Sequence, residues 1–140
     1  MISKSFEFKK ININDYNYYL FYGENNGLKN EIIEIHFKTR FSANHYNYEE
    51  DVILKNKDNF FDEILTKSFF EEEKLIIISE TTSKIIPVIE ELIEKKIDDI
   101  FVILFQPSFS RYPTMADILF RLANHTPSDT KLDSKVHHQF

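Results

Sequence analysis

The sequence predicts an α/β protein on the α+β border, a single domain with the element order βββαβαβα. Two short apolar runs, residues 74–79 and 100–105, flank a segment with helical periodicity at residues 83–96. Strands covered on both faces lose their polar alternation, so this arrangement is typical of a βαβ unit, which we expect to be right-handed. Upstream, strict alternation at residues 31–41 is typical of a strand with one wet face. An N-terminal antiparallel meander and the βαβ unit would then form one mixed sheet.

The meander is predicted from three segments in a row. Residues 5–13 form a first strand with a bulge or bend, and residues 16–22 form a second strand that is aromatic on both faces. The chain's only two glycines, Gly23 and Gly27, lie between the second and third strands. Because Asn and Gly tolerate positive φ, this segment is interpreted as a hairpin turn.

The third predicted strand, residues 31–41, has the clearest alternation in the chain. Its two expected faces are apolar, with Ile33, Ile35, Phe37 and Phe41, and polar, with Glu34, His36, Lys38 and Arg40. Residues 42–56 are expected to be a polar connection, whose apolar centre at residues 52–54 is compatible with an additional edge strand. Apolar residues four apart then predict a helix over residues 59–70, with Asp58 or Asn59 as its N-cap.

The second half of the chain contains the βαβ unit. Its helix must begin near Ser83 or Lys84, because Pro87 is tolerated only in or just beyond the first turn. A last helix is expected over residues 114–124. Residues 1–125 would form the globular domain, and residues 126–140 a polar tail that is either disordered or docked.

Composition limits the classes of function. The chain lacks cysteine, which excludes disulfides and thiolate metal sites, and no apolar run approaches the length of a membrane span. A cytoplasmic location and no membrane association are therefore expected. Residues 49–99 carry 15 acidic and 7 basic side chains, a net charge of −8, whereas the rest of the chain is slightly basic and the total is −6. With only three arginines in the chain, nucleic acid is an unfavourable partner.

No motif specifies a catalytic, cofactor or metal site, and none is predicted. The phosphate-binding signatures are rejected because both glycines are assigned to the hairpin turn. The five histidines are scattered, and no nucleophile elbow or paired metal-binding histidines are present. Glu80 follows the first buried strand, where open α/β sheets place ligands. A small enzyme with its site near Glu80 is therefore the alternative to a non-catalytic protein.

Two features favour a protein partner. Six of the seven tyrosines fall within the first 48 residues, and the middle third is acidic. Tyrosine is favoured at interfaces, although cross-strand packing and a solvated acidic face would explain the same residues. The predicted partner-binding residues are Tyr46, Tyr48, Glu49, Glu50, Asp51, Glu71, Glu72, Glu73, Glu90, Glu91 and Glu94.

We therefore expect a non-catalytic binding module for a basic protein. Its most concrete form is an immunity or antitoxin-type inhibitor that occludes a basic toxin such as a nuclease. Complementary charge would speed association, and no catalytic residue is needed. A non-catalytic subunit of a larger complex fits the same observations.

Overall fold

The computed structural model describes residues 2–4, 17–22, 26–41, 44–68, 73–97, 99–106 and 137–139. In this part of the chain one sheet has a body of four strands: β2 (Tyr18–Tyr22), β3 (His45–Glu49), β4 (Lys74–Ser79) and β5 (Ile100–Phe105). Their order across the sheet is β2-β5-β4-β3. Two three-residue strands, β1 (Ile2–Lys4) and β6 (His137–Gln139), extend the sheet beyond β2. Every described strand pairing is parallel, so the fold is α/β.

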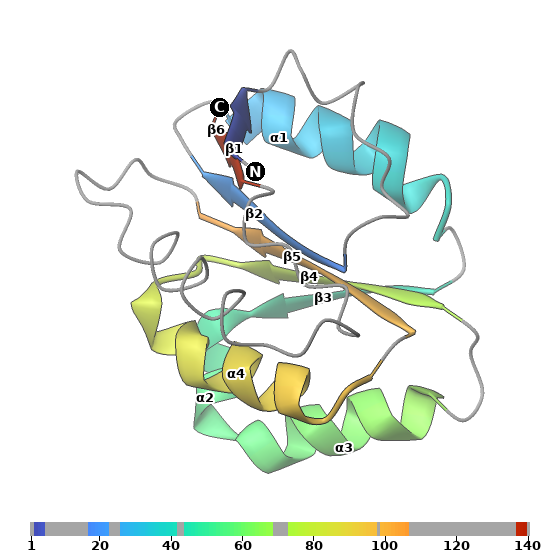
Figure 1. Ribbon diagram of the computed structural model, residues 1–140, viewed down its shortest axis with the longest axis vertical. Coiled ribbons are helices and arrows are strands. Elements are labelled where there is room, and N and C mark those ends of the chain that lie inside the picture. Colours follow the sequence, from blue (N-terminus) through green and yellow to red (C-terminus); the bar gives the residue numbers. More distant parts are fainter. Residues whose placement is uncertain are drawn as a thin grey trace.

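The predicted antiparallel meander and mixed sheet are wrong. The segment expected to be the third strand is the helix α1 (Asn26–Ile32), which continues into a π-helix, η3 (Ile33–Lys38). Ile33, Phe37 and Phe41 are buried, whereas Ile35 is 54% exposed. The buried positions are therefore spaced four apart. The helix covers one face of the sheet and connects β2 to β3 at the far edge (Figure 1).

The βαβ unit is present as predicted. β4 and β5 are neighbouring parallel strands, with Ile77 opposite Ile103. They are joined by a 3-10 turn, η4 (Ser83–Ile85), and the helix α4 (Ile86–Glu94). Pro87 lies in the first turn of α4, where its missing N–H leaves no hydrogen bond unmade.

The segment between η3 and β4 differs from its prediction. It contains the strand β3 at the sheet edge, followed by the helix α2 (Glu50–Lys55), so residues 52–54 are helical and form no edge strand. The predicted next helix is present as α3 (Lys57–Ser68). Its cap is Asn56 rather than Asp58 or Asn59, because the Asn56 Oδ1 accepts a hydrogen bond from the Asn59 N–H at 3.1 Å.

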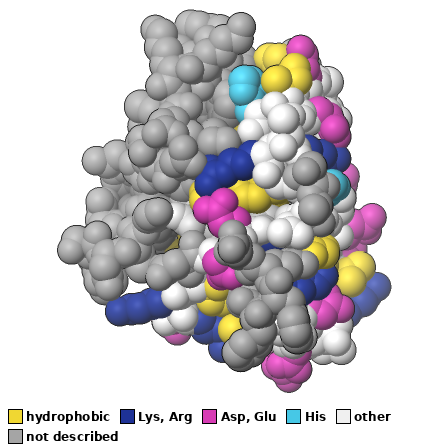
Figure 2. Space-filling model, turned by 90° about the vertical axis from the view of Figure 1, so that its right-hand side faces the viewer, with side chains coloured by type: hydrophobic (Ala, Val, Ile, Leu, Met, Phe, Trp, Pro, Cys, Tyr) yellow, Lys and Arg dark blue, Asp and Glu magenta, His cyan; other side chains and the backbone are white. Residues whose placement is uncertain are grey.

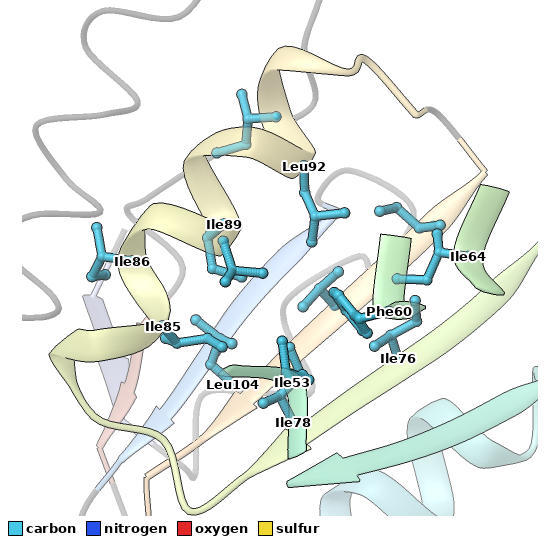
Figure 3. Packing of buried hydrophobic residues seen from close by; sticks show 14 of the residues in the cluster. Ile53, Phe60, Ile64, Ile76, Ile78, Ile85, Ile86, Ile89, Leu92 and Leu104 are labelled. Atoms are coloured by element: carbon cyan, nitrogen blue, oxygen red, sulfur yellow. The ribbon is translucent and has the colours of Figure 1, made fainter. Parts of the chain in front are cut away.

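Helices cover both faces of the sheet. Ile76 and Ile78 point to the face covered by α2, α3 and α4, where they pack among Phe60, Ile64 and Ile89 (Figure 3). Leu75 and Ile77 point to the opposite face, where α1 and η3 supply further buried apolar residues. Each strand alternates between two apolar environments, which is why the apolar run of β4 is continuous.

Other predictions fall on residues outside the described set. These include the first strand at residues 5–13 and the last helix at residues 114–124. Within the predicted tail, β6 pairs with β1 and with β2. The boundary at residue 125 stays a prediction.

Candidate functional site

The carboxyl ends of the parallel strands lie at one edge of the sheet, the usual ligand position in open α/β folds. A pocket of about 250 Å³ lies there, on the face of the sheet that α1 and η3 cover. Seven of its ten lining residues are polar or charged, and the full lining comprises Asn26, Asn30, Ile33, Glu34, Lys38, Asn47, Ile77, Ser79, Glu80 and Phe105. This carboxyl-edge pocket is the candidate site.

The register of the strands and the change of helix type bring the lining together. Asn47 of β3 lies opposite Ile77 of β4. On the helix side, the winding changes from α to π at Ile33, and the Lys38 ammonium bonds the Glu34 carboxylate at 2.6 Å. Short π-helical segments are rare and occur frequently at functional sites.

Glu80 follows β4 in a left-handed backbone conformation, with φ of 55°. For a residue other than glycine this conformation costs about 1–3 kcal/mol, so the surrounding loop must hold it. The Ser79 hydroxyl donates to the Tyr48 carbonyl at 3.3 Å, and the Thr81 N–H donates to the Phe105 carbonyl at 3.2 Å. Glu80 itself is exposed and has no hydrogen-bond or ion-pair partner among the described residues.

Glu50 anchors the same loop from α2. Its carboxylate is 3% exposed and accepts hydrogen bonds from the Thr82 N–H at 3.1 Å and the Thr82 hydroxyl at 2.9 Å. The Thr82 hydroxyl oxygen accepts in turn from the Lys84 N–H, at the start of η4. Glu50 therefore holds the loop that presents Glu80.

A buried lysine lies behind the pocket wall. The Lys29 ammonium donates to the Gln106 carbonyl at 2.7 Å and lies 4.4 Å from the ring centre of Phe105, which lines the pocket. The side chain is fully buried, and this burial lowers the pKa of Lys29 to about 8. Lys29 joins α1 to the end of β5.

The hairpin turn assigned to Gly23 and Gly27 is wrong, and the reason given for rejecting a phosphate-binding loop is lost with it. Gly27 lies in α1, and the segment joins a strand to a helix as such loops do. The pattern G-x-x-x-x-G-K-[ST] is still not matched, because Leu28 separates Gly27 from Lys29 and Asn30 replaces the hydroxyl residue. The Lys29 ammonium also bonds the backbone of Gln106. This segment does not fit a phosphate.

The pocket lining contains carboxylates, side-chain amides, one ammonium and one hydroxyl. It contains no histidine, and the hydroxyl of Ser79 is bonded to the Tyr48 carbonyl. Glu34 is paired with Lys38. Nowhere in the described ranges do three or more His, Cys, Asp or Glu side chains form a group that could hold a metal ion. No nucleophile in the lining is hydrogen-bonded to a base.

The two predicted partner-binding tyrosines pack against α3. The Tyr48 hydroxyl donates to Glu63 at 2.9 Å, and its ring lies edge-on to Phe60. The Lys67 ammonium lies 3.3 Å from the ring centre of Tyr46. Both tyrosines are half-buried against this helix, and their partner-binding role stays a prediction.

The predicted acidic residues do not form one group. Glu49 and Asp51 are exposed at the carboxyl edge, whereas Glu50 is buried. Glu73 precedes β4 at the opposite end and pairs with Arg40 at 2.9 Å. Figure 2 views the molecule from the side where the strands begin in Figure 1, and acidic and basic side chains are mixed over its described part.

The remaining predicted acids lie on α4 or outside the described residues. Glu90, Glu91 and Glu94 are partly or fully exposed on α4, and Glu71 and Glu72 are not described. The partner-binding role of the whole set stays a prediction.

Sequence reasoning identified Glu80 by its position after a buried strand. It missed Asn26, Asn30 and Asn47. Asn26 was assigned to the hairpin turn and Asn47 to the polar connection, and Asn30 lay just before the predicted third strand. A possible signal was the spacing of Asn26 and Asn30, which places both on one face of a helix.

Within the described ranges, no helix has the length and apolar character needed to cross a membrane. Comparison with known proteins adds no family: no family model matches the chain, and neither does any curated protein.

Proposed function

We propose that the protein is a non-catalytic binding module that recognises a basic protein through the carboxyl edge of its sheet. The observation that carries this proposal is the grouping of exposed carboxylates there. Glu49 lies opposite Ser79 in the β3–β4 register, so Glu49, Asp51 and Glu80 belong to the same edge. Exposed carboxylates accelerate the approach of a basic surface by long-range attraction.

Its most concrete form is an immunity or antitoxin-type inhibitor that occludes a basic toxin such as a nuclease. A non-catalytic subunit of a larger complex would use the same surface. The two forms differ in their effect on the partner. An inhibitor abolishes the partner's activity at a one-to-one ratio, whereas a subunit leaves that activity intact or supports it.

The test begins with a partner that co-purifies from the native host, followed by stopped-flow association with the purified pair. Reversing charge in Glu49→Lys/Asp51→Lys should slow association by about tenfold at low salt. The difference should shrink near 0.15 M salt, where the Debye length is about 8 Å.

The matched control is Asp58→Lys/Asp62→Lys, which makes the same charge change at two exposed positions of α3. It should slow association much less. Equal slowing by both double variants would mean that net charge alone governs association, and the carboxyl edge would lose its assignment.

A small enzyme with its site near Glu80 is the second candidate, and the polar pocket around this residue favours it. Glu80→Gln separates the two. If this variant kept its partner affinity but lost the protein's biological activity, the enzyme would replace the binding module.

A further inference from the structure

The carboxyl-edge pocket offers hydrogen-bond acceptors from separate elements. Asn26 and Asn30 of α1 and Asn47 of β3 bring exposed side-chain amides, and Glu80 brings a carboxylate from the loop after β4. A planar guanidinium has five N–H donors in a fixed fork, which suits acceptors that converge from different directions. An ammonium group, as a compact point charge, uses such a spread of acceptors less well.

The net charge of the lining favours a positively charged ligand. Two carboxylates and one ammonium line the pocket, a net charge of −1. The ammonium of Lys38 is bonded to Glu34, whereas Glu80 has no partner among the described residues. An anion in the pocket would be repelled by the Glu80 carboxylate, whereas a cation would pair with it.

The size of the pocket suits a ligand of about one side chain. A volume of about 250 Å³ corresponds to roughly eight water molecules. It lies below the range of about 300–1,000 Å³ typical of sites for drug-sized ligands and cofactors. Ile33, Ile77 and Phe105 form the apolar part of the lining, which suits the methylene stem of a long basic side chain.

We infer that the carboxyl-edge pocket is the socket for one arginine side chain of the basic partner, an inference that rests on the proposed function. Glu80 is the residue that pairs with the arginine, because hydrogen bonds hold its loop. Ser79, Thr81 and Thr82 are each hydrogen-bonded to a neighbouring element, so the backbone that carries Glu80 is already held in place before the partner arrives. Preorganisation of this kind lowers the entropy cost of binding.

The direct test uses N-acetyl-L-arginine N-methylamide as the probe, titrated into the full-length isotope-labelled protein. The side-chain amide signals of Asn26, Asn30 and Asn47 should shift and saturate. The corresponding capped lysine should bind about threefold more weakly or worse. Glu80→Gln should weaken arginine binding by about tenfold, since a charge-assisted hydrogen bond is lost. Asp62→Asn removes an exposed carboxylate on α3, outside the pocket lining, and should leave the affinity unchanged.

Four outcomes would overturn the socket. One is an unchanged affinity for capped arginine in Glu80→Gln, and another is equal binding of capped lysine. The third is saturable binding of methyl glucoside with no arginine binding, which would make the pocket a site for a neutral hydroxylated ligand. Absence of any arginine-induced shift also counts against it.

Measurements with the partner separate failure of the socket from failure of the proposed function. If Glu49→Lys/Asp51→Lys slows association while Glu80→Gln leaves the dissociation rate unchanged, the socket is wrong and the binding module stands. If neither variant changes the kinetics, the proposed function itself is wrong. A faster dissociation in Glu80→Gln supports both.

Discussion

Lys29 shows how one buried side chain makes stability depend on pH. Its folded-state pKa of about 8 lies below the ordinary value of 10.5, so between these values the unfolded chain binds more protons. Stability should therefore rise as pH increases from 8 towards 10.5. Below pH 8 the lysine is protonated in both states, and its contribution no longer varies.

Lys29→Met should remove this dependence. From pH 7.5 to 9.5 the wild-type protein should gain about 1–2 kcal/mol of unfolding free energy relative to the variant, measured by urea denaturation. The exposed Lys55 provides the matched control, because Lys55→Met should keep the wild-type slope. Parallel pH curves for wild type and Lys29→Met would show that Lys29 titrates normally.

At the residue scale, the sequence predicted the position of Glu80 but little of its surroundings. An apolar run followed by a charged residue marks the end of a buried strand, and this is a local signal. Asn47 lies in the same pocket because of the register between β3 and β4. This register pairs residues that are 30 positions apart in the chain. Pairing over such a distance leaves no trace in a local pattern.

At the element scale, α1 and η3 can be tested by two substitutions that a strand and a helix treat differently. A strand would place Ile35 and Phe37 on the same face, whereas the helix exposes Ile35 and buries Phe37 completely. Ile35→Ala should change stability by less than about 0.5 kcal/mol, and Phe37→Ala should cost about 3–5 kcal/mol. Comparable losses in thermal or chemical denaturation would favour the strand.

The error at residues 31–41 has a simple physical cause. Apolar residues at 33, 37 and 41 satisfy both a period of two and a spacing of four. Because Ile35 is also apolar, the alternation looked complete and favoured a strand. In three other elements the period was unambiguous. The core face of α3 and the continuous apolar runs of β4 and β5 each fit one structure, and those elements were predicted correctly.

At the scale of the whole molecule, β5 is a central strand of the sheet. It lies between β2 and β4, and helices cover both of its faces. Ile103 is completely buried there. Ile103→Asp would bury an unpaired charge and should prevent folding, so that the variant shows no cooperative unfolding transition at ordinary temperature. Val52→Asp introduces the same charge at a position that is 57% exposed and should melt within a few degrees of wild type. A folded Ile103→Asp protein, detected by circular dichroism, would refute this sheet order.

The strand order also explains why the global topology escaped prediction. Consecutive strands usually lie side by side, and that expectation produced the meander. Here β2 and β3 are separated by both β4 and β5, so the chain crosses the four-stranded body of the sheet before it returns. Only the returning half, β3 to β4 to β5, follows the usual rule.

This path has a consequence for how the protein is made. The Asn17 side chain, next to β2, bonds the Ile100 carbonyl 83 positions later, and β2 pairs with β5 in the finished body of the sheet. At translation rates of about 5–20 residues per second, β2 waits roughly 4–17 s for that neighbour to be synthesised. During this interval its edge is open to other nascent chains. Early chaperone engagement of the first hundred residues would protect it.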